Sequence, residues 1–279
     1  MSECVCALNI QANNSCIPNE IISHIANIEN TTSSKLKEKL NCTDDLCIIN
    51  NANIENQLKK KIEIEYFKPL VESLSVDYWL NNTEIDTILM QLQKNYEGFA
   101  YSFIHMIDLV MFPPNNFDTL EHKISPITKI NFGKEFLKKN EVHCRGNKLK
   151  SFGVVFNTDP SDRTGQHWFT IFINHNQKLD NYTIELFNSS GKDIANKKFN
   201  EFWINTSYDI SKTTKKECKF FKVSNIQHQK NNTGSCGAYS LFYIYARLNG
   251  VPYEEFNNKT RIISDYEMNS FRKLLFRLA

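Results

Sequence analysis

Apolar residues in the first 75 positions are scattered among polar stretches rich in Asn, Lys and Glu, with neither Gly nor Trp. In the segments 21–28 and 54–66 the apolar residues recur at helical spacing, three and four positions apart. The pattern therefore predicts a mostly helical, polar N-terminal arm, which we assign to residues 1–76.

The pattern changes from Tyr78 onward. Apolar positions between Glu84 and Leu92 again have helical spacing, with Thr83 as the expected N-cap. The stretch from Pro113 to Pro126 is predicted to be an irregular connection without regular secondary structure. Four short runs rich in β-branched and aromatic residues then indicate strands, separated by turn-forming residues: 152–156, 168–173, 182–187 and 220–223.

Two helices are expected near the C-terminus. Residues 237–248 place apolar side chains along one side and end at Asn249-Gly250, a stop signal that Pro252 reinforces. Ser264 or Asp265 is the expected cap of a last amphipathic helix. A helix, a run of strands and a long buried helix together predict an α+β core domain, residues 77–279.

Composition excludes several classes of protein. A net charge of +2 is too close to neutral to indicate a nucleic-acid binder. No stretch approaches the roughly 20 apolar residues that a membrane span needs, and the first residues lack the basic start and apolar run of a secretory signal. We therefore expect neither nucleic acid nor membrane as a partner.

The chain has eight cysteines, too few at this length for a disulfide scaffold. Five of them lie in the first fifty residues: Cys4, Cys6, Cys16, Cys42 and Cys47. Their spacing does not match the usual paired zinc ligands, so free thiols in a reducing cytosol are expected, with no metal and no organic cofactor.

Cys236 is the strongest candidate for chemistry. It directly precedes Gly237, at the predicted N-terminus of the buried helix, where unpaired N–H groups and the helix dipole favour a thiolate. Gly237 would let a substrate carbonyl come close to the backbone. The alternative is a small buried thiol without a reactive role.

A thiolate nucleophile needs a base, and His167 has the most informative setting. It opens the predicted strand 168–173, whereas His175 and His228 lie in polar loops and are expected to bond to solvent. Asn188 ends the next strand, so its amide oxygen could accept a hydrogen bond from the ring of His167 and fix its tautomer. Cys236, His167 and Asn188 would then form a triad, although a histidine at a sheet edge bonded to solvent is the plainer alternative.

Three segments carry a family resemblance: Gly165-Gln-His-Trp-Phe-Thr-Ile-Phe-Ile173, Glu185-Leu-Phe-Asn-Ser-Ser-Gly191 and Gln229-Lys-Asn-Asn-Thr-Gly-Ser-Cys-Gly237. They resemble the cysteine proteases that include SUMO-specific proteases, adenovirus proteinase and viral polyprotein-processing relatives. The resemblance is good over residues 150–279 and loose over 78–149. It implies the mixed β-sheet of these proteases, flanked by helices.

Site residues follow from this resemblance. It implies that Cys236 is the nucleophile, that His167 is the base which later protonates the leaving amine, and that Asn188 orients His167. Gln229 matches the family's oxyanion-hole glutamine, seven positions before the cysteine as in adenovirus proteinase. Asn231 or Asn232 could supply that donor instead. Many relatives place an acid directly before the cysteine, where this chain has Ser235.

A second match concerns specificity. The segment Tyr78-Trp-Leu-Asn-Asn-Thr-Glu-Ile85 resembles the Trp-Leu-Asn-Asp segment of the SUMO proteases, with Asn82 in place of the acid. In those enzymes this tryptophan and the one after the catalytic histidine flank the substrate's Gly-Gly. The resemblance implies the same substrate-binding role for Trp79 and Trp168, and core packing is the alternative. Trp203 belongs to no motif and is expected in the core.

Three functions are compatible with these features. The first is an endopeptidase that cuts after Gly-Gly in viral structural polyproteins, in the host cytoplasm at assembly sites and in the virion. The second is removal of SUMO or ubiquitin-like modifiers from conjugates. The third is an inactive module that binds Gly-Gly tails, which an intact set of catalytic residues disfavours.

Overall fold

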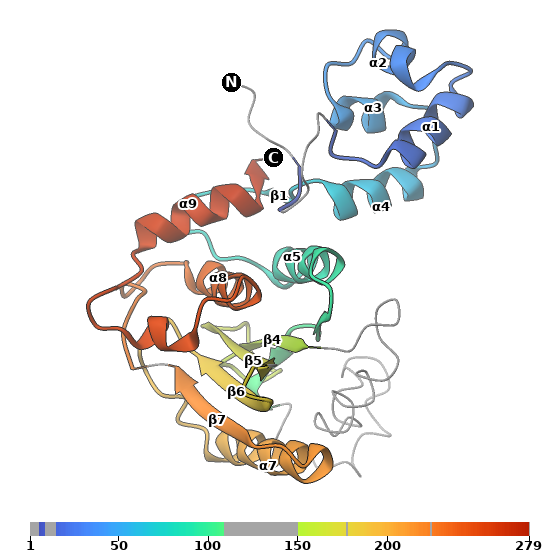
Figure 1. Cartoon of the computed structure of the whole chain (residues 1–279). Coiled ribbons are helices and arrows are strands. Elements are labelled where there is room, and N and C mark those ends of the chain that lie inside the picture. The colour runs from blue at the N-terminus through green and yellow to red at the C-terminus, as the bar shows by residue number, and fades with distance from the viewer. Residues whose placement is uncertain (1–5, 9–14, 109–149, 177, 224, 279) are drawn as a thin grey trace. The chain divides into compact units, whose positions relative to one another are not determined.

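The computed structural model describes residues 6–8, 15–108, 150–176, 178–223 and 225–278 (Figure 1). The chain divides into two compact units, one formed by residues 1–74 together with 272–279 and the other by residues 75–271. The division falls close to the expected boundary after residue 76, but the last eight residues group with the N-terminal unit. The expected connection 113–126 lies outside the described residues.

The N-terminal unit is mostly helical, as its apolar spacing predicts. It contains α1 (Asn19–Ile28), a short 3-10 helix (Ser33–Lys35), α2 (Leu36–Lys39), α3 (Asp45–Asn51) and α4 (Asn56–Tyr66). Two short strands, β1 (Leu70–Val71) and β8 (Arg277–Leu278), pair in parallel. Isoleucines from α1, α3 and α4 form its core, among them Ile25, Ile48 and Ile62.

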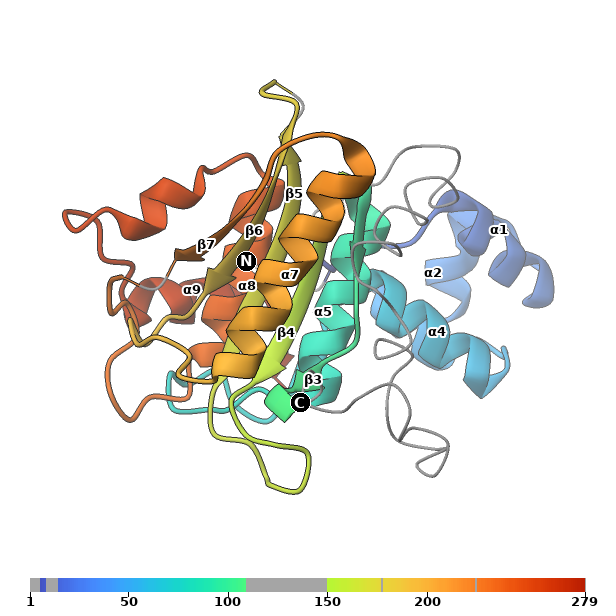
Figure 2. The same ribbon diagram turned by 90° about the horizontal axis from the view of Figure 1, so that it is seen from below.

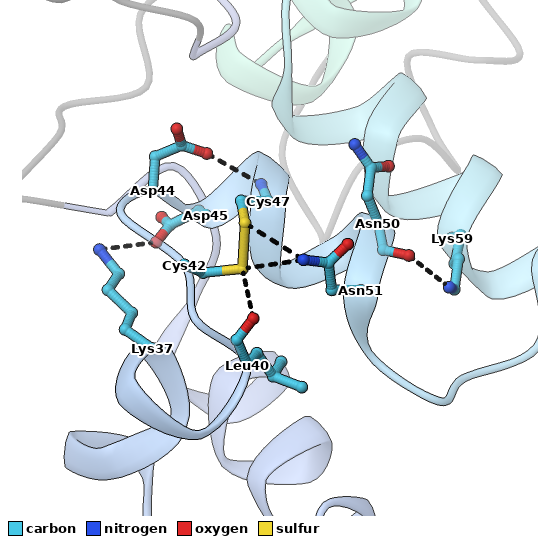
Figure 3. The surroundings of a disulfide bond; sticks show 9 residues. All are labelled: Lys37, Leu40, Cys42, Asp44, Asp45, Cys47, Asn50, Asn51 and Lys59. Carbon is cyan, nitrogen blue, oxygen red and sulfur yellow. Dashed lines mark hydrogen bonds and ion pairs between the residues drawn. A yellow bond between two sulfur atoms is a disulfide. The ribbon is translucent and has the colours of Figure 1, made fainter.

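Two disulfides in this unit correct the expectation of free thiols. Cys6 pairs with Cys16 and Cys42 with Cys47, at Cα–Cα distances of 5.1 and 5.5 Å. The Asn51 side chain donates to both sulfurs of the second bridge (Figure 3). The fold brings each pair into the separation that a disulfide requires, and spacing along the chain does not reveal this.

The second unit is built on a six-stranded mixed sheet. Its strands are β2 (Phe99–Tyr101), β3 (His105–Met106), β4 (Ser151–Asn157), β5 (Trp168–Asn176), β6 (Asn181–Phe187) and β7 (Cys218–Val223). The order is β2-β4-β5-β6-β7, with β3 also on β4. β5 is antiparallel to both of its neighbours, β4 and β6, whereas β2 and β3 pair in parallel with β4, and β7 pairs in parallel with β6. All four expected strands are confirmed.

Helices cover both faces of this sheet. α5 (Asn82–Asn95) and α8 (Cys236–Leu248) pack on one face, and α7 (Lys197–Thr214) packs on the other against β6 and β7 (Figures 1 and 2). A 3-10 helix (Tyr253–Asn257) and α9 (Asp265–Leu275) complete the chain. The expected α+β fold, a central mixed sheet flanked by helices, is confirmed.

Two local expectations need correction. α5 begins after Asn81 rather than after Thr83: the Asn81 side chain accepts from the Glu84 N–H, and the Glu84 carboxylate accepts from the Asn81 N–H. This reciprocal pair, a capping box, satisfies two N-terminal donors and sets the start of the helix at Asn81. α7 was not expected at all; it provides the crossover that the parallel strands β6 and β7 require.

The last helix begins where one of the two expected caps predicts. The Ser264 hydroxyl accepts from the Glu267 N–H, and the Glu267 carboxylate accepts from the Ser264 N–H, so Ser264 is the cap. Asp265 is the first residue of the helix. Across the described ranges, no helix combines the length and apolar character needed to cross a bilayer.

Candidate active site

A cavity of about 900 Å³ opens in the second unit, at the end of the sheet where β5 begins and β6 ends. It is lined by four of the six expected catalytic and substrate-binding residues: Trp79, His167, Asn188 and Gln229. The loop 230–233 and the segment 192–196 form further walls. Cys236 and Trp168 are not among the lining residues; both side chains are buried.

His167 and Asn188 are hydrogen-bonded. The strands β5 and β6 are antiparallel, so the residue before β5 lies beside the residue after β6. The Nε2 atom of His167 is 2.6 Å from the Oδ1 atom of Asn188. The contact expected from the order of the strands is therefore present.

The amide of Asn188 is held in one orientation. Its Oδ1 atom accepts from the backbone N–H of Ser190 at 3.1 Å and from the Ser190 hydroxyl at 3.0 Å, while its Nδ2 atom donates to the carbonyl of Lys192 at 2.9 Å. A backbone N–H only donates, so the oxygen must face His167. Nε2 of His167 consequently carries a proton, and the lone pair of neutral His167 lies on Nδ1.

Burial lowers the pKa of His167, the Asn188 hydrogen bond raises it, and the positive charge of Lys192 lowers it, with a net downward shift. The ring is therefore neutral over more of the physiological pH range than a free histidine. A neutral imidazole with its lone pair on Nδ1 is suited to accept a proton from a thiol.

Asn157 holds the loop that leads into His167. Its Oδ1 atom accepts from the backbone N–H groups of Asp159 and Gln166, both at 3.0 Å. Gly165 has φ +93°, and a Cβ there would lie 2.6 Å from the Asn157 side chain, so glycine is required. Sequence reasoning missed Asn157, although a polar residue between a strand and the turn former Pro160 was a signal.

Cys236 is the first residue of α8, and its side chain is fully buried. Leu80 connects it with the histidine strand. The Trp168 indole N–H donates to the Leu80 carbonyl at 3.0 Å, and a Cβ on Gly237 would lie 3.1 Å from the Leu80 Cβ. One turn further on, the Thr170 hydroxyl of β5 donates to the Ser240 carbonyl of α8. Trp168, next to His167, and Gly237, next to Cys236, therefore both contact Leu80.

Hydrogen bonds fix Gln229 beside Asn188. Its backbone N–H donates to the carbonyl of Ser189 at 3.0 Å, and the Ser189 hydroxyl donates to its Oε1 atom at 2.9 Å. Its Nε2 atom donates to the carbonyl of Thr233 at 2.7 Å. Nε2 has a second proton, and the residue lines the same cavity as His167.

The two asparagines weighed as alternative donors, Asn231 and Asn232, also line the cavity. The Asn231 oxygen accepts from the Gln227 side chain at 3.1 Å. Asn232 has φ +64°, a left-handed conformation that asparagine tolerates better than most residues. Gln229 is buried, and hydrogen bonds hold both its side-chain amide and its backbone N–H, so it is the most firmly held of the three.

Ser235, the departure from the family pattern, has a structural role here. Its side chain is buried, and its hydroxyl donates to the carbonyl of Val76 at 3.0 Å. At the neighbouring Gly234, a Cβ would lie 2.5 Å from the carbonyl oxygen of Asp77 and 2.6 Å from the Trp79 ring. These contacts join the loop before Cys236 to the segment before Trp79, and an acid at position 235 would face a carbonyl oxygen.

The two tryptophans differ in exposure. Trp79 is 49% exposed and lines the cavity. Trp168 is only 6% exposed, with its indole N–H bonded to Leu80. Their substrate-binding roles stay a prediction. Trp203 is fully buried in the hydrophobic core, as the sequence predicts.

His228 is not the solvent-bonded residue expected from its polar loop. It is 4% exposed, its Nε2 atom donates to the carbonyl of Phe256, and its Nδ1 atom accepts from the N–H of Ile263. Burial lowers its pKa. His175 lies in β5 rather than in a loop, and its partly buried ring is 3.1 Å from the Asp180 carboxylate. Within the part of the chain that the structure describes, no group of three or more His, Cys, Asp or Glu residues could hold a metal.

Comparison with known proteins identifies the chemistry. Residues 153–278 match the Ulp1 protease family, C-terminal catalytic domain. The chain is 31% identical to a SUMO-1 cysteine protease of African swine fever virus, over 94% of this chain and 96% of that protein. A cysteine protease from another strain of that virus is 29% identical over the same shares.

A solved structure agrees with these sequence matches. The crystal structure of an African swine fever virus protease superposes with a TM-score of 0.69 and 29% identity, covering 100% of this chain and 97% of that one. The match extends beyond the catalytic unit to the N-terminal unit. This chain therefore belongs to the Ulp1 protease family and is a cysteine protease.

Proposed function

We propose that this cysteine protease is an endopeptidase that cleaves after Gly-Gly in viral structural polyprotein precursors. The observation that carries the proposal is the hydrogen bond between His167 and Asn188 in the wall of a cavity that also contains Gln229. Viral relatives support a viral setting, and the resemblance of the three motif segments supports polyprotein substrates.

Acylation would begin with proton transfer from Cys236 to Nδ1 of His167. The thiolate attacks the carbonyl carbon of the second glycine, so a carbon–sulfur bond forms and the carbonyl oxygen becomes an oxyanion. The imidazolium then gives its proton to the departing amine as the peptide C–N bond breaks. The Asn188 oxygen would hold Nε2–H throughout, so that Nδ1 would remain the nitrogen that exchanges the proton with Cys236.

The oxyanion would be stabilised by the second N–H of Gln229 and by the backbone N–H of Cys236 at the start of α8. One such donor is worth roughly 3–4 kcal/mol of transition-state stabilisation. The hydrogen bonds to Ser189 and Thr233 support this role, since they hold the amide in place before substrate arrives.

Deacylation reverses the roles. His167 takes a proton from water, the hydroxide attacks the thioester carbon, and the carbon–sulfur bond breaks to release a carboxylate.

Selection of Gly-Gly would come from Trp79 and Trp168. The half-exposed indole of Trp79 lies at the cavity and packs against Gly234, where no Cβ fits. A narrow slot between two apolar walls would exclude any side chain larger than hydrogen. We propose that the enzyme acts in the host cytoplasm at assembly sites and in the virion.

A second candidate is removal of SUMO or ubiquitin-like modifiers, favoured by the name "SUMO-1 cysteine protease" of one relative. The chemistry is the same, but the amine that departs is a lysine side chain. A short fluorogenic Gly-Gly peptide cannot separate the two.

The deciding experiment incubates a viral capsid precursor and, separately, a SUMO conjugate with wild-type protein and with Cys236→Ala, followed by mass spectrometry. The proposal expects new C-termini ending in Gly-Gly from the precursor, absent with Cys236→Ala. Release of the modifier with no cleavage of the precursor would select the second candidate.

A further inference from the structure

Asp265 is a buried carboxylate that contacts the loop 230–233, which follows Gln229. It is the first residue of α9 and is 6% exposed. Its Oδ2 atom accepts from the backbone N–H of Lys230 at 3.0 Å, and its Oδ1 atom accepts from the Thr233 hydroxyl at 3.3 Å. Both oxygens of the carboxylate therefore bind the loop that follows Gln229.

These two contacts are at the two ends of a tight turn. The turn passes through Asn231 and Asn232, and Asn232 has the left-handed φ of +64°. The Thr233 hydroxyl also lies 3.1 Å from the carbonyl of Lys230, so its single proton is shared between that oxygen and Asp265. A charged acceptor that holds both ends of a turn stabilises it more than neutral partners do.

The turn from Lys230 to Thr233 also positions the side chain of Gln229. The carbonyl of Thr233 accepts from Nε2 of Gln229 at 2.7 Å. One proton of this amide is thus directed by Thr233, and because the amide is planar the direction of the other follows from it. A shift of Thr233 moves the amide with it.

Asp265 also lies beside the helix that carries the nucleophile. Tyr239, three residues after Cys236, donates its hydroxyl to the carbonyls of His228 and Ile263. Burial and the neighbouring charge of Asp265 raise the pKa of Tyr239, so the phenol keeps its proton. Asp265 therefore borders both the loop of Gln229 and the first turn of α8.

We infer that Asp265 is a positioning residue for catalysis, holding Gln229 through Lys230 and Thr233 in the geometry that stabilises the oxyanion. It touches neither substrate nor the reacting atoms. The inference rests on the proposed role of Gln229 as oxyanion donor.

The test is the near-isosteric variant Asp265→Asn, assayed on a Gly-Gly peptide. Asparagine keeps the shape but removes the negative charge, so the charge-assisted hydrogen bonds to the Lys230 N–H and to Thr233 become weaker neutral ones. We expect kcat to fall on the order of tenfold, as for one hydrogen bond to a charged group, while KM changes less than about twofold. Alkylation of Cys236 by iodoacetamide needs no oxyanion donor, and its rate should stay at the wild-type value.

Glu267→Gln is the matched control. Glu267 lies in the same first turn of α9, but its carboxylate accepts from Ser264 and not from the loop. This variant should retain wild-type kcat. Thr233→Val, which keeps the shape and removes the hydroxyl, should lower kcat in the same way as Asp265→Asn and provides a second variant if the first folds poorly.

A double-mutant cycle separates the inference from the proposed function. If Asp265 acts through Gln229, Asp265→Asn should cost nothing further in a Gln229→Ala background. Additive losses, an unchanged kcat in Asp265→Asn and Thr233→Val, or an equal slowing of alkylation would overturn the inference alone. A wild-type kcat in Gln229→Ala itself would instead contradict the oxyanion role assigned to that residue.

Discussion

His167 and Asn188 are joined by a 2.6 Å hydrogen bond that connects the start of β5 with the end of β6. Removing the acceptor in Asn188→Ala should lower kcat on a Gly-Gly peptide roughly 10- to 150-fold, since a hydrogen bond to a charged group is worth about 1.5–3 kcal/mol. Cys236→Ala and His167→Ala should lose far more. Steady-state kinetics check this order, and an Asn188→Ala variant as inactive as His167→Ala would contradict an orienting role.

The pKa of His167 gives a second prediction. In the Cys236→Ala background, NMR titration of His167 should show a midpoint below the ordinary 6.5, because burial and Lys192 outweigh the Asn188 hydrogen bond. Lys192→Gln removes one lowering influence and should move the midpoint up. Asn188→Ala removes the raising influence and should move it down.

Lys230→Gln is the control for that titration. Lys230 lines the same cavity, but its charge is not among the causes of the shift. A midpoint that moves as far in Lys230→Gln as in Lys192→Gln would show a general field effect rather than the specific influence of Lys192.

Trp79 should determine glycine selectivity. The wild-type enzyme should prefer Gly-Gly over Gly-Ala by roughly 10- to 200-fold in kcat/KM, the range for one methylene in a tight pocket, and Trp79→Ala should lose most of this preference. Tyr208→Ala is the control: it removes another exposed aromatic side chain, on α7 at the opposite face of the sheet, and should leave the preference for Gly-Gly over Gly-Ala unchanged. An unchanged preference in Trp79→Ala would remove that residue from the specificity site.

The N-terminal disulfides are testable by differential alkylation. In unfolded, unreduced protein, four cysteines should resist alkylation until reductant is added: Cys6, Cys16, Cys42 and Cys47. Their loops are short, so each bond should stabilise its unit by about 2–3 kcal/mol in the chain-entropy account. Alkylation of all four without reductant would support the free thiols expected from the sequence.

Much of the catalytic unit could be predicted from sequence because its strands are continuous runs of β-branched and aromatic residues. The order of those strands was enough to expect His167 beside Asn188. The sequence also indicated a helix beginning at Cys236, since a polar loop gives way there to an apolar helical pattern.

What the sequence did not reveal depends on partners far away in the chain. α7 has helical spacing from Phe199 through Trp203 to Ile210, but only the parallel pairing of β6 with β7 makes a crossover helix necessary. His228 was expected in solvent because its sequence neighbours are polar, whereas Phe256 and Ile263 bond both of its ring nitrogens. Asp265 looked like one of two possible helix caps, and its contacts with the loop after Gln229 are visible only in the fold.

Covalent trapping is the most direct test of the claim that Cys236, activated by His167, cleaves after Gly-Gly. A Gly-Gly peptide with a C-terminal vinyl sulfone should add once per chain, on Cys236, and peptide mapping should place it there. Burial raises the pKa of the Cys218 thiol to about 12, so Cys218 should remain unlabelled and serves as the internal comparison. Labelling should vanish in Cys236→Ala and slow strongly in His167→Ala; adduct on Cys218, or labelling that persists in Cys236→Ala, would contradict the account.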